Sequence, residues 1–144
     1  MVGPSVTVTL SDAPRSADRV LPEGTSPDDV VVHQQDVQGV VNALWSGGAE
    51  AMQIMDQRVI ATSAVRCVGN TLILQGRVYS PPYKITAIGD PERLSQALDD
   101  SADVATYRYY ADTFGLVYEV AAEARTKLPG YDGSLDLLHA EVAP

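Results

Sequence analysis

Hydrophobic and polar residues alternate strictly near the start of the chain. Over Ser5–Leu10, the apolar residues Val6, Val8 and Leu10 are separated by threonines. A period of two predicts a strand with one buried face, because successive side chains of a strand point to opposite faces. Residues 11–29 are rich in Pro, Ser, Asp and Gly and show no periodicity, which predicts a long surface loop.

The clearest helix follows this loop. Its apolar residues recur at spacings of three and four, which places them on one helical face. They are Val37, Val40, Val41, Leu44 and Trp45. Gly47 and Gly48 then end the helix, since a glycine easily adopts the left-handed conformation found at helix C-termini. We expect Trp45 to anchor this face in the core.

Short apolar runs separated by turn residues fill the middle of the chain. Ala49–Met55 predicts a strand, and Asp56-Gln57 predicts a tight turn into Arg58–Ala61. A meander of short strands is expected next, because Gly, Asn and Pro between the runs supply the backbone angles that turns need. Its strands are Val65–Val68, Thr71–Gln75, Arg77–Tyr79 and Tyr83–Ile88.

The last third begins with a helix start. Asp90 before Pro91 is typical of an N-terminus, where Asp caps the first turn and Pro fits the first helical position. A second helical piece over Val104–Thr113 is expected to end at Gly115. Leu116–Leu128 predicts a long strand by its alternation, although its second half has helical propensity.

A closing strand is expected over Ser134–Val142. The resulting order is strand, helix, several strands, helix, strand, strand. This order predicts an α+β fold, with a mostly antiparallel sheet and two main helices on one face, related to the ferredoxin-like type. A chain of 144 residues is expected to form one domain over residues 1–144.

Charge and composition narrow the function classes. The formal net charge of −9 would repel a phosphate backbone, so nucleic-acid binding is disfavoured. No run of about 18 apolar residues occurs, so we expect no membrane span, and the N-terminus lacks the apolar stretch of a signal peptide. The single cysteine, Cys67, excludes an internal disulfide and a cysteine-based zinc site.

Catalytic chemistry has few candidates. His33 and His139 lie at opposite ends of the sequence, and no nucleophile elbow accompanies them. Neither a phosphate-binding loop nor a dinucleotide fingerprint is present. The acidic pairs Asp28-Asp29 and Asp99-Asp100 lack the spacing of a calcium-binding loop. We therefore assign no catalytic residue, no metal site and no cofactor.

Two sets of residues are candidates for binding. Tyrosines and prolines in exposed turns favour contact with a protein partner, because Tyr buries a large area at low entropic cost. This candidate interaction surface comprises Tyr79, Pro81, Pro82, Tyr83 and Tyr109. Tyr107 and Tyr110, three residues apart, are instead expected to pack their helix on the sheet. A candidate ligand cleft comprises Asn42, Arg58 and Arg66.

Three segments together carry a family resemblance: VTVTLSDAP (6–14), NALWSGGAEAMQI (42–54) and VRCVGNTLILQGRVYSPPYKITAIGDP (65–91). They resemble the YlxW/YlxX-like family of bacterial domains of unknown function, sometimes called division initiation proteins, and especially its actinobacterial members. The resemblance implies that a membrane helix and a coiled-coil stalk precede this domain in a longer protein. It also implies that the domain lies outside the cytoplasm, and it implies no catalytic residues.

Three functions compete at this point. The leading hypothesis is a non-enzymatic, extracytoplasmic protein-interaction domain of a membrane-tethered envelope protein, which forms a homo-oligomer through its coiled coil. The second is a small-ligand sensor that uses the cleft of Asn42, Arg58 and Arg66. The third is a hydrolase that uses His33 or His139 with nearby carboxylates.

Overall fold

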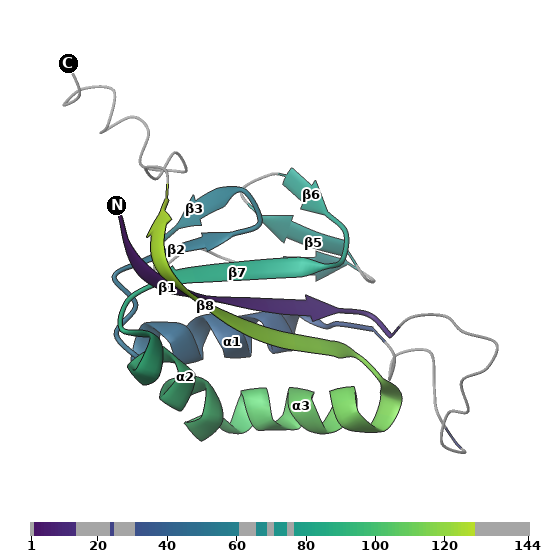
Figure 1. Ribbon diagram of the computed structural model, residues 1–144. Helices are drawn as coiled ribbons and strands as arrows, with labels where there is room; N and C mark the ends of the chain where they lie inside the picture. The colour runs from purple at the N-terminus through teal and green to yellow at the C-terminus, as the bar shows by residue number, and fades with distance from the viewer. Residues whose placement is uncertain are drawn as a thin grey trace.

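An antiparallel sheet with helices on one face organises the chain, as Figure 1 shows for the computed structural model. The structure describes residues 2–13, 24, 31–60, 66–68, 71–74 and 77–128. The strands are β1 (Val2–Ser11), β2 (Ala51–Ile54), β3 (Gln57–Val59), β4 (Arg66–Val68), β5 (Thr71–Leu74), β6 (Arg77–Tyr79), β7 (Tyr83–Ile88) and β8 (Val117–Lys127). The helices are α1 (Gln34–Ser46), α2 (Pro91–Asp100) and α3 (Ala102–Phe114).

The topology confirms the predicted fold class. The main sheet has the order β3-β2-β7-β1-β8, and every pair in it is antiparallel. The chain also has the split arrangement of a ferredoxin-like fold. Its elements follow one another in the order β1, α1, β2, β7, the helix pair α2–α3, and β8. Strands β3 to β6 are inserted between β2 and β7, and β4-β5-β6 form a second, smaller sheet.

One face of the main sheet forms the core with the helices. Val6, Val8 and Leu10 of β1 are fully buried, and they stand opposite Ala87, Ile85 and Tyr83 of β7. The apolar stripe of α1 covers this face, as its spacing predicted. The other face is more polar, because the intervening positions carry hydroxyl side chains. There the hydroxyl groups of Thr7 and Thr86 lie 3.1 Å apart and share a hydrogen bond.

Helix ends follow the predicted capping chemistry. Asp90 accepts a hydrogen bond from the backbone N–H of Glu92 at 3.0 Å, and Pro91 occupies the first position of α2. Gly48, just after α1, and Gly115, just after α3, have φ angles of +92° and +83°. Both therefore adopt the left-handed conformation that glycine tolerates best.

The two helical segments expected after Asp90 and over Val104–Thr113 form separate helices, because Ser101 ends α2 and its Oγ accepts a hydrogen bond from the backbone N–H of Val104 at the start of α3. One prediction needs correction. The tight turn was predicted at Asp56-Gln57 but lies one residue earlier, at Met55-Asp56, so that Gln57 begins β3.

The smaller sheet is tied to the main sheet by a buried amide. Gln57 donates from Nε2 to the carbonyl oxygen of Leu74 at 3.0 Å and contacts Tyr79 Oη at 2.6 Å. Leu72 and Leu74 are fully buried in the same core as the helices. The inserted strands therefore extend the core of the main sheet.

Several predicted segments lie outside the described residues. They are most of the loop 11–29, residues 69–70 and 75–76 within the predicted meander, the strand Ser134–Val142 and His139. Among the helices that are described, none combines the length and the apolar character needed to cross a membrane.

Candidate functional site

A close crossing between α1 and α3 shapes the outer face of the helix layer. Gly39, in the middle of α1, is buried against Asp103, in the first turn of α3. A Cβ atom on residue 39 would lie 2.8 Å from Asp103 Cβ, which is closer than such atoms approach. A glycine is therefore required for the two helices to meet this closely.

A polar groove of about 240 Å³ lies along this crossing. Carboxylates, side-chain amides and a hydroxyl group line it, without a basic side chain. The lining residues are Gln35, Asp36, Gln38, Gly39, Asn42, Asp103 and Thr106. Sites for drug-sized ligands usually enclose about 300–1,000 Å³. This groove is therefore better matched to a single side chain of a partner than to a metabolite.

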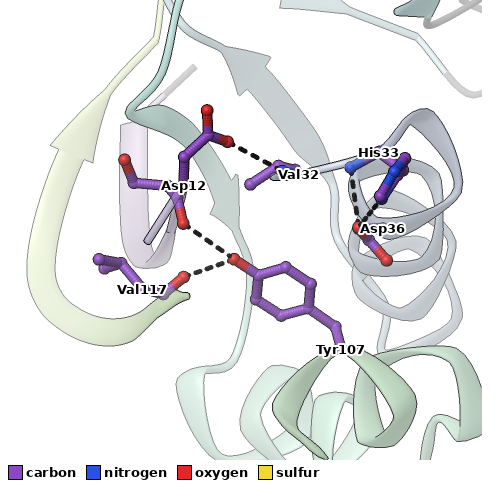
Figure 2. Close-up of polar contacts among 7 residues, drawn as sticks. Asp12, Val32, His33, Asp36, Tyr107 and Val117 are labelled. Atoms are coloured by element: carbon purple, nitrogen blue, oxygen red, sulfur yellow. Dashed lines mark hydrogen bonds and ion pairs between the residues drawn. The ribbon is translucent and has the colours of Figure 1, made fainter. Parts of the chain in front are cut away.

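Asp36 is the most buried carboxylate of this groove. Its Oδ2 accepts a hydrogen bond from the backbone N–H of His33 at 2.8 Å and lies 3.6 Å from His33 Nδ1 (Figure 2). The Asp36 side chain is only 13% exposed, whereas that of His33 is 44% exposed. Burial raises the pKa of Asp36 above its ordinary value, and the hydrogen bond and charge of His33 only partly offset this.

Tyr107, a buried residue of α3, fixes this helix to the sheet. Its hydroxyl group donates to the carbonyl oxygen of Val117 at 2.7 Å, with the carbonyl oxygen of Ser11 3.5 Å away (Figure 2). Burial raises the pKa of Tyr107, and the charge of Asp36 raises it further. A neutral Tyr107 therefore donates this bond throughout the physiological range and holds α3 to the start of β8.

An aromatic cluster lies further along α3. Tyr109 and Tyr110 meet edge to face with ring centroids 5.8 Å apart, and Tyr110 stacks on Phe114 at 5.5 Å. Tyr109 is 64% exposed and Tyr110 is 38% exposed. Exposed aromatic groups of this kind are enriched at protein interfaces.

The groove and the aromatic cluster share one face of α3. Asp103, Thr106 and Tyr110 are three and four residues apart, so they follow one another along the helix. From Asp103 to Tyr110 the helix rises by about 10 Å. A single extended segment of a partner can therefore contact both features.

The helix layer is strongly acidic. Its carboxylates are Asp36, Glu92, Asp99, Asp100, Asp103 and Asp112, and its only cations are Arg93 and Arg108. Arg108 is further neutralised by Asp99, whose Oδ1 lies 3.3 Å from Arg108 Nη1. This surface therefore attracts basic groups.

The predicted interaction surface is divided by the structure. Tyr83 is fully buried in β7, so its expected contact with a partner is corrected: its ring faces the core. Tyr79 is half-buried, and its hydroxyl group donates to Asp56. Pro82 is exposed and Pro81 half-buried in the turn between β6 and β7. Tyr109 alone among these residues joins the aromatic cluster of α3.

Tyr110 also departs from its expected role. Tyr107 packs on the sheet as predicted and is 1% exposed, but Tyr110 turns toward Phe114 at the surface. The three-residue spacing placed both tyrosines on one face, but the stripe that meets the core is narrow. It runs through Val104 and Tyr107, and Tyr110 lies at its margin.

The predicted ligand cleft is not assembled among the described side chains. Asn42 lines the groove on α1, and Gln38 donates to its side-chain oxygen at 2.8 Å. Arg58 pairs with Gln53 in the register of β2 and β3, one position away from the helix-facing Met52 and Val59. It therefore points to the face of the sheet opposite the helices. The side chain of Arg66 lies outside what the structure describes.

Sequence reasoning missed the groove, because its two walls are far apart along the chain. One signal was present: Gly39 interrupts the apolar stripe of a helix, where glycine is unfavourable unless a neighbour requires it. Among the described residues, no group of three or more His, Cys, Asp and Glu side chains is arranged to hold a metal ion.

Comparisons with known proteins place this fold among bacterial proteins without an assigned function. The chain is 31% identical over 132 residues to the UPF0749 protein Rv1823 of Mycobacterium tuberculosis, a match that covers 90% of this chain and 43% of that protein. It is 34% identical over 97 residues to the UPF0749 protein YlxW of Bacillus subtilis, which covers 67% and 40% of the two chains. The chain thus spans less than half the length of these relatives.

A solved structure shares the fold. The crystal structure of an uncharacterized conserved protein from Mycobacterium tuberculosis aligns with a TM-score of 0.65 and 26% identity, over 93% of this chain and 87% of that one. A family model described as "Bacterial protein of unknown function (DUF881)" matches residues 1–141. The predicted resemblance to the YlxW-like family is therefore confirmed, and the chain belongs to the DUF881 family of bacterial proteins.

Proposed function

We propose that this domain is a non-enzymatic protein-interaction module that binds a segment of another protein along α3. The observation that carries this proposal is the alignment of a carboxylate-lined groove with an exposed aromatic cluster on one helical face. The groove selects charge, and the cluster supplies apolar contact area. Together they provide specificity and affinity from separate groups.

The geometry defines the partner by its chemistry. A Lys or Arg side chain fits the groove between Asp36 and Asp103, where it also meets amide oxygens. An apolar or aromatic residue of the same segment then covers Tyr109 and Tyr110, about 10 Å further along α3. Around these two anchors, the carboxylates at the junction of α2 and α3 and on α3 favour additional basic residues; they are Asp99, Asp100 and Asp112.

The setting of this module is also part of the proposal. We infer a membrane-tethered protein of the cell envelope, associated with cell division, with this domain outside the cytoplasm and a coiled-coil stalk that makes it a homo-oligomer. The support is the family resemblance together with the length of the relatives, in which more than half of the chain lies outside the matched part. That length leaves room for an anchor and a stalk.

Site-specific crosslinking tests the docking surface. Photoreactive benzoylphenylalanine is placed at Tyr109 of the full-length protein in cells, and at Lys84, which is exposed on the sheet, as a matched control. We expect crosslinking from residue 109 and not from residue 84, with a mapped partner segment that contains basic residues. The same product from both positions, or a segment without basic residues, would contradict the proposal.

Charge variants test the groove in the same assay. Replacing both groove carboxylates, Asp36→Asn with Asp103→Asn, should reduce the crosslinking yield at residue 109. Replacing two exposed carboxylates elsewhere, Glu50→Gln with Glu92→Gln, removes the same charge and should leave the yield unchanged. Equal loss in both double variants would show that only net charge matters.

Thiol labelling tests the compartment independently. In a Cys67→Ser background, Tyr109→Cys provides an exposed thiol on α3. We expect a membrane-impermeant maleimide to label intact cells that carry the full-length protein. Labelling only after lysis would place the domain inside the cytoplasm. Sedimentation of the protein with its stalk should give an oligomer, and a strict monomer would contradict the stalk.

A further inference from the structure

Strand β8 is an edge strand with an open side. It pairs with β1 along its whole length, and it stands last in the order β3-β2-β7-β1-β8. No other strand in the described part of the chain pairs with it. Its outer backbone N–H and C=O groups are therefore directed away from the sheet, where they can accept another strand.

The side chains of β8 are exposed on both faces. All seven residues from Glu119 to Arg125 are exposed, including Val120 at 41%. Strand side chains alternate between faces, so neither the helices nor a second layer covers this stretch. Figure 1 shows β8 curving along β1, away from α3, toward the end of the sheet. Most strands gain their stability from burial, and this segment has little.

The two faces of β8 differ in chemistry. Tyr118, Val120 and Ala122 stand opposite Leu10, Val8 and Val6 of β1, and so they lie on the helix-facing side. Glu119 and Glu123 stand opposite Thr9 and Ser5 and lie on the other side. An incoming strand thus meets an apolar row on one face and a carboxylate row on the other.

A second copy of β8 fits this edge poorly. Two copies of β8 could pair antiparallel about a two-fold axis. If the axis passes through Glu119, the Glu119 residues of the two copies stand opposite each other, and if it passes through Ala121, Glu119 of each copy stands opposite Glu123 of the other. If it passes through Val120, all four carboxylates lie on one face of the pair, at diagonal positions. Like charges at opposite positions destabilise a strand pair. The carboxylate row therefore favours a basic partner over self-pairing.

The pairing of β8 with β1 limits the regular part of the edge. Ser5 pairs with Glu123 and Gly3 with Thr126, so β8 contains one extra residue between these pairs. A bulge of this kind bends the strand and ends regular pairing. The edge that is regular enough to receive another strand is therefore Val117–Glu123.

We propose that Val117–Glu123 of β8 is a strand-addition site for an extended segment with alternating apolar and basic residues. The apolar residues of this segment cover Tyr118, Val120 and Ala122, and its basic residues pair with Glu119 and Glu123. The inference rests on the proposed function in that the partner is a protein. It uses a surface different from the groove and the aromatic cluster, so the two can be tested separately.

A synthetic heptapeptide that alternates lysine and valine, with blocked ends, serves as the probe. We expect it to slow amide hydrogen exchange within Val117–Glu123 of the intact chain. A second peptide has the same sequence, but its alternate backbone nitrogens are methylated, so that one edge of the extended peptide has no N–H donor. This peptide keeps its charge but cannot donate backbone hydrogen bonds from that edge to β8. It should bind at least about tenfold more weakly, which corresponds to two lost hydrogen bonds.

Matched variants separate this site from general electrostatic attraction. Glu119→Gln with Glu123→Gln should weaken the heptapeptide about tenfold, as expected for two lost ion pairs. Glu50→Gln with Glu92→Gln removes the same charge and should change binding less than about twofold. Equal weakening by both pairs, equal binding of the methylated peptide, or protection elsewhere would overturn the proposal. If the strand-addition proposal fails but the proposed function holds, crosslinking from residue 109 should still occur as described above.

Discussion

Strands β7 and β8 flank β1 on either side, and both pair with it antiparallel over most of its length. They differ in what covers them. In β7, four of six residues are buried, whereas β8 has no buried residue among its eleven. Backbone pairing alone therefore does not indicate where the stability of a sheet resides. In this domain, the side chains of β7 form part of the core, whereas the exposed side chains of β8 are available for binding.

The physical reason is the size of the two contributions. A backbone hydrogen bond replaces one to water and contributes about 1 kcal/mol net, whereas burying a large aliphatic side chain contributes about 1.5–3 kcal/mol. Selection for stability thus acts strongly on β7 and weakly on β8. Residues of β8 can be chosen for a partner at little cost to folding.

The largest expected effect separates the two strands directly. Ile85→Ala, in the fully buried part of β7, should lower the free energy of unfolding by about 2–5 kcal/mol. Val120 lies in the exposed part of β8, on the other side of β1 from Ile85. Val120→Ala should change the free energy of unfolding by less than about 0.5 kcal/mol. Urea unfolding monitored by Trp45 fluorescence measures both. Similar losses in the two variants would refute the comparison.

The helix layer that covers β7 depends on Gly39. Gly39→Ala should destabilise the fold by about 1–2 kcal/mol, because the added methyl group clashes with Asp103 and the gain in helix propensity offsets only part of the cost. Asn42→Ala, on an exposed position of the same helix, is the control and should stay within about 0.5 kcal/mol. A stabilised Gly39→Ala variant would show that α1 and α3 do not meet closely.

The start of β8 is the part that the helix layer does hold. Tyr107→Phe removes the hydrogen bond to Val117 and should cost about 1 kcal/mol. Amide exchange should also accelerate at the first residues of β8 and not in β7. If exchange in β7 rises equally, this bond supports the whole sheet and not only the attachment of β8.

The smallest expected effect concerns the pH dependence of stability. Burial raises the pKa of Asp36 in the folded state above its ordinary value of 3.8, so the proton binds more tightly to the folded than to the unfolded chain. The resulting stabilisation is complete below about pH 3.8 and is lost as the pH rises through the raised value.

Asp36→Asn removes this titration but keeps an oxygen that can accept from His33 N–H. Its free energy of unfolding, relative to the unsubstituted chain, should therefore rise as the pH increases from about 3.5 to about 7. Urea unfolding at a series of pH values measures the difference. A difference that falls with rising pH would mean that ionised Asp36 stabilises α1 through the helix dipole.

Local patterns predicted much of the fold from sequence alone. The alternation around Val6 and Val8, the stripe of α1, and the Asp90-Pro91 cap depend on residues that are close in the chain, and the structure confirms them. The alternation also indicated β8 as a strand despite the helical propensity of its alanines, because pairing with β1 outweighs that propensity.

Contacts between distant residues could not be predicted in the same way. The sequence predicted β7 as the last strand of a meander, but β7 pairs with β1 and β2 and not with β6. The meeting of Gly39 and Asp103, which creates the groove, joins residues on separate helices. Similarly, alternation in β8 suggested a buried face, and only the three-dimensional structure shows that the helices do not cover Glu119–Arg125.

Amide hydrogen exchange on the isolated, dilute chain tests the uncovered edge most directly. If β8 has one neighbour, amides within Glu119–Arg125 should divide into a slow set that bonds to β1 and a fast set that faces outward, while the central β7 is slow throughout. Uniform slow exchange across Glu119–Arg125, equal to that of β7, would show that the outer edge is already covered and would contradict the account.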